Sequence, residues 1–254
     1  MKNVKNLSAI VIASSALLLS TQANADTLLG GYLGAQAWNM DATGGFSENE
    51  NIAGFAFESE QNASFYAALE HPIPLVPNIK LARTTMDTQG STTLDTQFNF
   101  GDEVFLANAT LDTQIEMTAT DYILYYELLD SDIATLDIGV AAKQLEGDIV
   151  VVDQDGNMAE EEFDGMIPMA YAKVAFGLPL TGLGVFAEGT FLSIDDDSFT
   201  DYQAGISYNF VETLAIDMTI QLGYRSTELD IEDLDDIYAN LEFDGAFLGI
   251  EFDF

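Results

Sequence analysis

Alternation of apolar and polar residues is the feature of this 254-residue chain that most constrains its fold. In segment 216–225 every second residue is apolar, and the residues between them are polar or glycine. The same pattern recurs over 202–210 and, more briefly, over 136–140. Because successive side chains of a β-strand point to opposite faces, this period of two predicts strands with one apolar and one polar face. Helical spacing fits none of these segments.

The pattern extends to ten predicted strands, and most are long enough to cross a bilayer, which takes about 9–11 tilted residues. They span residues 27–40, 62–70, 78–88, 114–129, 135–152, 164–176, 184–194, 199–210, 214–228 and 237–254. The short connections are 71–77, 130–134, 177–183 and 211–213, and the mostly longer, acidic ones are 41–61, 89–113, 153–163, 195–198 and 229–236. This rhythm predicts an all-β fold, a closed antiparallel transmembrane β-barrel of about ten strands. Eight strands are the alternative, and 87–112 has room for an extra hairpin.

The first residues have the three-part order of a secretory signal. Lys2 and Lys5 precede an uncharged apolar run over 7–19, and Ala23-Asn24-Ala25 forms a small-residue cleavage pattern before Asp26. The apolar run is shorter than the roughly 20 residues that a membrane-spanning helix needs. We therefore expect residues 1–25 to be removed on export and residues 26–254 to form the barrel domain.

The chain is strongly acidic, with 43 Asp and Glu against 7 Lys and Arg, for a formal net charge of −36. Such a molecule repels nucleic acid, so no nucleic-acid partner is expected. Its 17 Phe and 10 Tyr argue against disorder, and the absence of cysteine excludes both disulfides and an N-terminal lipid anchor on cysteine. Mean hydropathy is +0.12 with no long apolar run after residue 26, so the apolar residues are dispersed among strands.

The C-terminal segment supports the barrel independently. Apolar residues recur there with a period of two and end on an aromatic: Ala246, Leu248, Ile250, Phe252 and Phe254. The stripe from Leu248 to Phe254 looks like the last-strand signal that barrel-assembly machinery recognises in bacterial outer-membrane proteins. Phe247 stands where a polar residue is commoner in that signal.

The mature N-terminus and the first short turn carry a family resemblance. The N-terminal motif is Leu28-Leu29-Gly30-Gly31-Tyr32-Leu33-Gly34 followed by Trp38, and the turn reads Leu69-Glu70-His71-Pro72-Ile73-Pro74 with Pro77-Asn78. Together with the last strand, these residues resemble a family of small bacterial outer-membrane barrels named for a Gly-Gly near the mature N-terminus. The resemblance implies location and architecture, and no functional residue is carried over from it. The glycines Gly30, Gly31 and Gly34 are compatible with a ligand groove and equally with close packing of the wall or a bend.

In lipid, backbone groups must be paired within the protein, so the sheet must close. On the lipid side we expect Ile216, Met218, Ile220 and Leu222, with Tyr208, Phe210, Tyr224 and Phe252 in interfacial aromatic belts. All five basic residues after the leader lie in predicted strands: Lys80, Arg83, Lys143, Lys173 and Arg225. Arg83 has outward parity unless the strand bulges or the side chain snorkels.

The inward charges predict a polar network that fills the lumen, as is usual in barrels of roughly eight to ten strands. Its predicted members are Glu70, Lys80, Glu127, Asp137, Lys143, Lys173, Glu188, Asp217 and Arg225. A charged constriction in a conducting pore is the alternative.

The remaining acidic residues are expected in extracellular loops. They include Asp195-Asp196-Asp197, Glu160-Glu161-Glu162 and the run Glu228, Asp230, Glu232, Asp233, Asp235 and Asp236. Such carboxylates favour a solvated surface, with divalent cations bridging them to lipopolysaccharide as the alternative. Asp153, Asp155, Asn157 and Asp164 are a weak candidate cation loop, because Met158 occupies the position where a calcium loop needs glycine. A carboxylate-bearing turn is preferred.

Catalysis finds little support in the sequence. The only histidine, His71, precedes Pro72 in a predicted short turn, and no spacing singles out a carboxylate pair. We expect no enzyme and no cofactor. The expected function is that of an outer-membrane barrel with a structural or surface role, and the alternative is a small cation-selective pore or a small-ligand transport or binding barrel. Expected partners are outer-membrane lipid, lipopolysaccharide, the barrel-assembly machinery and divalent cations.

Overall fold

The computed structural model is built from β-strands and describes residues 29–49, 51–131, 133–194, 197–213, 215–234 and 237–254. The predicted leader, residues 1–25, lies outside these ranges. Among the described residues there is no helix long and apolar enough to cross a membrane.

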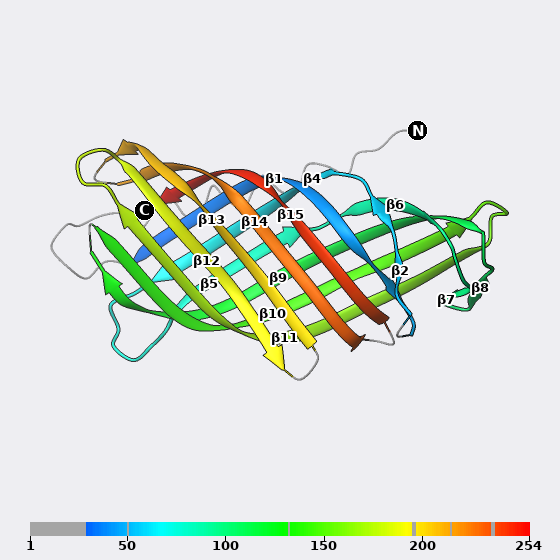
Figure 1. Cartoon of the computed structure of the whole chain (residues 1–254). Helices are drawn as coiled ribbons and strands as arrows, with labels where there is room; N and C mark the ends of the chain where they lie inside the picture. Colours follow the sequence, from blue (N-terminus) through cyan, green and yellow to red (C-terminus); the bar gives the residue numbers. More distant parts are fainter. Residues whose placement is uncertain (1–28, 50, 132, 195–196, 214, 235–236) are drawn as a thin grey trace, which may run out of the picture.

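Ten strands of the described chain form a ring (Figure 1). They are β1 (Gly30–Ser47), β4 (Glu60–Glu70), β5 (Asn78–Thr85), β9 (Thr110–Asp130), β10 (Ala134–Asp153), β11 (Met158–Gly177), β12 (Leu183–Ile194), β13 (Asp197–Glu212), β14 (Asp217–Leu234) and β15 (Ile237–Asp253). Every neighbouring pair is antiparallel. The first and last strands pair from Tyr32↔Asp253 to Ser47↔Tyr238, which closes the ring. The predicted closed antiparallel barrel of ten strands is confirmed.

Four short connections lie at one end of the barrel, which we call the turn end. They are 71–77, 131–133, 178–182 and 213–216, close to the predicted short turns. The chain ends there too, because the backbone N–H of Phe254 donates to the carbonyl of Gly31 at 2.9 Å. Because the number of strands is even, the beginning of β1 and the end of β15 lie at the same end of the barrel.

At the other end of the barrel, the sequence predicted long loops where the structure has continued strands. β1 continues to Ser47, β10 and β11 are joined by only 154–157, and β14 continues to Leu234. Segment 89–113 contains strand structure as well: β6 (Thr88–Thr93) pairs with β9, and β7 (Phe98–Phe100) pairs with β8 (Glu103–Phe105). The remaining short strands are β2 (Ala53–Gly54) on β1 and β3 (Ala56–Phe57) on β6. This β7–β8 pair is the extra hairpin for which the sequence left room.

The two faces of the wall exchange character partway along the strands. On β10, Ile138 and Val140 point outward and are exposed, while Lys143 points inward and is buried. Two residues further, Leu145 takes the buried inward position and Glu146 the outward one. We call the part with apolar outward residues the barrel section and the part beyond it, with an apolar interior, the extension.

The barrel section has the thickness of a membrane. On β13 the outward residues from Tyr202 to Phe210 are all apolar or aromatic. At a rise of about 3.3 Å per residue and a tilt of about 40°, these nine residues span roughly 23 Å, close to the roughly 25 Å apolar band of outer-membrane barrels. The outward faces of Ile220, Leu222, Tyr224 and Tyr208 are exposed as predicted.

The extension contains its own hydrophobic core. Its buried residues come from seven strands of the ring, from the β7–β8 hairpin and from connecting residues, and they include a group of phenylalanines: Phe46, Phe55, Phe98, Phe100 and Phe105. The rings of Phe46 and Phe55 stack with centroids 4.7 Å apart, and Phe98 stacks on Phe100 at 5.9 Å. Because an interior of this kind is stabilised by removal of apolar surface from water, the extension is built like a water-soluble β-sheet domain.

Candidate functional site

The upper lumen holds a group of four charged residues, which we call the Asp201 cluster: Asp121, Lys143, Asp201 and Arg225. Lys143 Nζ lies 2.7 Å from Asp121 Oδ1 and 2.9 Å from Asp201 Oδ2. Arg225 donates from Nη2 to Asp201 Oδ2 at 2.7 Å and from Nε to Oδ1 at 3.0 Å. Two cations thus balance two carboxylates, the arrangement that a buried charge requires.

This cluster reaches across the lumen. Arg225 on β14 also donates from Nη1 to Thr84 Oγ1 on β5 at 3.0 Å, and these strands lie four positions apart in the ring of ten. Each of these side chains points inward because its strand neighbours, such as Tyr224 and Tyr202, point outward to the apolar face.

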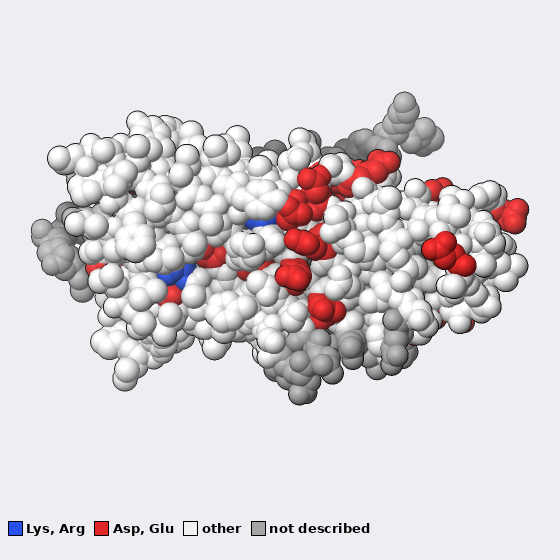
Figure 2. Space-filling model, viewed as in Figure 1, with Lys and Arg blue, Asp and Glu red and all other residues white. Residues whose placement is uncertain are grey.

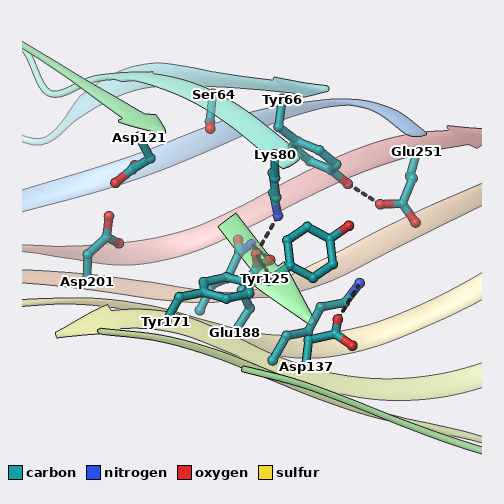
Figure 3. Close-up of polar contacts among 12 residues, drawn as sticks. Ser64, Tyr66, Lys80, Asp121, Tyr125, Asp137, Tyr171, Glu188, Asp201 and Glu251 are labelled. Carbon is teal, nitrogen blue, oxygen red and sulfur yellow. Dashed lines mark hydrogen bonds and ion pairs between the residues drawn. The ribbon is translucent and has the colours of Figure 1, made fainter. Parts of the chain in front are cut away.

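A second group, the Glu188 cluster, lies nearer the turn end and consists of Tyr66, Lys80, Tyr171, Glu188 and Gln203 (Figure 3). Lys80 on β5 forms an ion pair with Glu188 on β12, again four strands away. Tyr171 donates to Glu188 Oε1 at 2.9 Å and Gln203 to Oε2 at 3.2 Å. Lys80 Nζ also lies 4.5 Å from the centroid of the Tyr66 ring, within cation–π range.

The Tyr66 ring explains why position 34 of β1 is a glycine. A Cβ atom on Gly34 would lie 2.0 Å from Cζ of Tyr66, so the ring occupies the space that any side chain would need. The Tyr66 hydroxyl then donates to Glu251 Oε2 at 2.5 Å (Figure 3). At Gly34 the structure therefore shows close packing of the wall, and a ligand groove there is excluded.

The remaining residues of the predicted network lie nearer the turn end. Near the turn end Tyr125 donates to Glu70 at 2.8 Å, Asn78 donates to Glu127 at 3.0 Å, and Lys173 lies 4.0 Å from Asp137. Asp217 shares the inward parity of Gln221 and Arg225, and its Oδ1 accepts the backbone N–H of Thr213 at 3.0 Å, so it also caps the β13–β14 turn.

Sequence reasoning missed Asp121 and Asp201, the two acids of the upper cluster. Both lie in predicted strands next to an outward tyrosine, Tyr122 or Tyr202, so parity alone would have placed them inward. Parity shows direction but not height along the barrel. Which acid meets which base was therefore beyond the sequence.

Arg83 lies on the outer surface, as its parity indicated. Its side chain is 58% exposed and forms an ion pair with Glu146 at 3.2 Å. Its Nη1 also donates to Thr120 at 3.3 Å. These contacts place the guanidinium at the level where the outer face changes from apolar to polar, so it does not face the centre of the apolar band.

The candidate cation loop does not assemble. Asp153 Oδ1 accepts the backbone N–H groups of Asp155 and Asn157, both at 2.9 Å, and Asn157 Nδ2 donates to Asp153 Oδ2 at 2.7 Å. Hydrogen bonds from Asn157 lower the pKa of Asp153 below its ordinary value. Asp164 instead lies within β11, opposite Glu146. In the described parts of the chain, no three His, Cys, Asp or Glu side chains lie close enough to hold a metal ion.

His71 lies in the β4–β5 turn, as predicted. Its Nε2 is 3.2 Å from the carbonyl of Pro77, and its Nδ1 accepts the backbone N–H of Ile73 at 3.3 Å. Both ring nitrogens are thus used within the turn.

Outward acidic residues encircle much of the extension just beyond the barrel section, and we call them the acidic belt. The belt comprises Asp41, Glu116, Glu146, Asp148, Glu160, Glu162, Asp164, Glu228, Glu242 and Asp244. Figure 2 shows acidic side chains crossing the middle of the visible face, with an almost uncharged surface on the side of the turn end. The prediction that Glu160–Glu162, Glu228 and Asp230 lie in loops was wrong. They stand on β11 and β14, where the outward positions are polar because they face water.

The fold and lumen define the class of protein: a closed, side-chain-filled antiparallel β-barrel of the outer-membrane type. No protein-family model and no curated protein matches the sequence, so the Gly-Gly resemblance stays a prediction.

Several solved bacterial outer-membrane barrels align with this chain. The attachment invasion locus protein Ail of Yersinia pestis, solved with the heparin analogue sucrose octasulfate, aligns over 88% of this chain and 99% of its own with a TM-score of 0.39 and 10% identity. The transport unit of the Escherichia coli autotransporter AIDA-I covers 94% of each chain with a TM-score of 0.40 and 9% identity. Neisserial surface protein A covers 87% of this chain and 95% of its own with a TM-score of 0.31 and 12% identity. These likenesses concern the barrel fold alone.

Proposed function

We propose that this protein resides in the bacterial outer membrane as a closed, non-catalytic barrel that holds a folded acidic extension above the cell surface. The observation that carries the proposal is the exchange of faces between Lys143 and Leu145 on β10 and between Arg225 and Leu229 on β14. A wall that is apolar outside and polar inside suits lipid, and one that is polar outside and apolar inside suits water. The strands thus supply both the anchor and the exposed structure.

Two layers argue against conduction through the lumen. The Asp201 and Glu188 clusters join strands on opposite sides of the ring, and above them the interior is apolar from Trp38 to the phenylalanine group. A hydrated ion would have to break buried ion pairs and then enter an apolar core, and both steps cost several kcal/mol. The structural or surface role is favoured for this reason.

The acidic belt would lie at the level of the outer-leaflet headgroups. Carboxylates at this density attract cations, so we propose divalent ions between the belt and anionic lipopolysaccharide as partners, together with outer-membrane lipid around the barrel section. The stripe Leu248, Ile250, Phe252 and Phe254 supports recognition by the barrel-assembly machinery. Of these residues, Leu248 and Phe254 are the most exposed.

Single-channel recording in a planar bilayer tests the closed lumen. The refolded mature protein should show no stable conductance with or without calcium, while heat-modifiable gel migration proves that the barrel has folded. Steady cation-selective steps would overturn the proposal and make the luminal charges a pore lining.

One observation favours a second candidate, binding of a very small ligand within the lumen. A polar cavity of about 50 Å³ lies between the two clusters and is lined by Ser64, Thr84, Glu188 and Arg225 among others. Its size suits a few water molecules or a small cation rather than a metabolite. Ligand-dependent stabilisation of the folded barrel would support this candidate.

A further inference from the structure

Among the residues that the structure describes, one edge of β11 has no strand partner in the extension. β11 pairs with β10 from end to end, but with β12 only from Ala170↔Phe191 to Gly177↔Gly184. From Met158 to Met169, no strand in the described part of the chain pairs with its second side. Figure 1 shows β10 and β11 continuing well past the ends of β12 and β13. A free edge exposes backbone N–H and C=O groups that can pair with another strand.

An apolar cavity lies inside the extension, between β9, β10 and β11 on one side and β14 and β15 on the other. Its volume is about 30 Å³, and Leu145, Ile149 and Phe163 line it on the β10–β11 side. The lining on the other side comes from the β14–β15 hairpin, including Leu229 and Leu241. β12 and β13, which separate β11 from β14 in the ring, contribute none of the described lining residues. On the inward side of the β11 edge the interior is thus apolar at the level of Phe163, and we call this interior the apolar floor.

The charges beside this edge select the kind of strand that fits. Glu160, Glu162 and Asp164 point outward along β11, and Glu228 does so on β14. A second copy paired through the same edge would bring carboxylates opposite carboxylates, which is unfavourable. A strand with basic outward residues would meet opposite charge, and its alternate residues would face the apolar floor.

We propose that the β11 edge from Met158 to Ile167 accepts an extended segment of another polypeptide by strand addition, with alternating basic and apolar residues. Pro168 marks the lower limit of this segment, because proline has no N–H to donate and is tolerated at a free edge. Backbone hydrogen bonds supply affinity, and the acidic row and the apolar floor supply specificity.

Fluorescence anisotropy with the full refolded protein in detergent micelles tests the proposal. The probe is a peptide of about eight alternating Lys and Val residues, a usual strand length. The controls are a Glu-Val peptide and a Lys-Val peptide that is N-methylated at alternate residues and cannot complete the ladder. We expect the Lys-Val peptide to bind at least about tenfold more tightly than either control, a difference of about 1.4 kcal/mol.

Two further measurements separate strand addition from charge attraction. Amide hydrogen exchange should slow over 158–167 when the peptide binds. The double variant Glu160→Lys/Glu162→Lys should weaken binding by about tenfold, whereas Glu242→Lys on the fully paired β15 should have little effect. Equal binding of the N-methylated peptide, unchanged exchange over 158–167, or cross-linking of two copies through β11 would each overturn the proposal.

Discussion

Lys143 Nζ lies 2.9 Å from Asp201 Oδ2, although the two residues are 58 positions apart in sequence and three strands apart in the ring. The lysine is fully buried and also contacts Asp121, so a single ammonium group bridges the two carboxylates, and Arg225 supplies the second positive charge. The position of Lys143 marks the height at which the interior changes from polar to apolar, because Leu145 is the next inward residue on β10.

Replacing Lys143 by methionine should destabilise the barrel by about 3–5 kcal/mol, because Asp121 loses its cation and Asp201 keeps only Arg225. Urea unfolding followed by gel mobility measures the change. The double variant Lys143→Met/Asp121→Asn should recover much of the loss. Wild-type stability in Lys143→Met would show that the cluster does not hold the lumen closed.

Gly34→Ala should destabilise the folded barrel by about 1–3 kcal/mol, because its Cβ would overlap the Tyr66 ring. Gly31→Ala on the same strand is the control, since nothing lies within 4 Å of a Cβ there. Thermal unfolding distinguishes the two variants. If both variants lose the same stability, general loss of glycine flexibility would be the cause rather than packing on Tyr66.

Leu222→Lys and Glu228→Lys compare two outward positions on β14. The first lies in the barrel section and should cost about 2–4 kcal/mol of stability in lipid. The second lies in the acidic belt and should be within about 0.5 kcal/mol of wild type. Refolding into vesicles at a series of urea concentrations gives both values. Similar costs at the two positions would contradict the assignment of the membrane boundary.

Phe46→Ala should destabilise the extension by about 3–5 kcal/mol, because Phe46 is fully buried against Phe55, Phe98 and Phe100. The effect should be local. Hydrogen exchange should accelerate in β6 to β8 while the barrel section stays protected. Uniform acceleration over all strands would show that the two parts unfold as one unit.

The turn of Asp153 has a definite pH dependence. Its carboxyl pKa is lowered in the folded state, so the stabilisation is present above the unfolded pKa and is lost as pH falls through the folded pKa. Asn157→Ala should raise the Asp153 pKa, as measured by carbon-13 titration of the carboxyl group. Gln154→Ala, in the same turn, keeps the hydrogen bonds and should leave the titration unchanged.

The sequence alone determined the ten strands of the ring and the direction in which most of their side chains point in the barrel section. The alternation over 202–210 and 216–225 predicted which residues point outward in the barrel section, because a strand has only two faces and the apolar one is expected on the outside of a transmembrane barrel. It also placed four of the five basic residues inward and left Arg83 outside. Whether a side chain points inward or outward depends only on its own strand, so it can be predicted without knowing which strands pair.

The extension and the pairing of charges were decided only in the tertiary structure. Glu160–Glu162 looked like a loop because three consecutive acidic residues hide the alternation: Glu160 and Glu162 stand on the face that is apolar in the barrel section, and Glu161 stands on the other face. Alternation shows that a strand has an apolar face but not where that face points. It cannot show whether the apolar face of β11, which carries Phe163, meets lipid outside or the hydrophobic core inside. That choice depends on the height of the residues relative to the membrane. The meeting of Lys143 with Asp201 depends on how far the strands are shifted along one another around the closed ring.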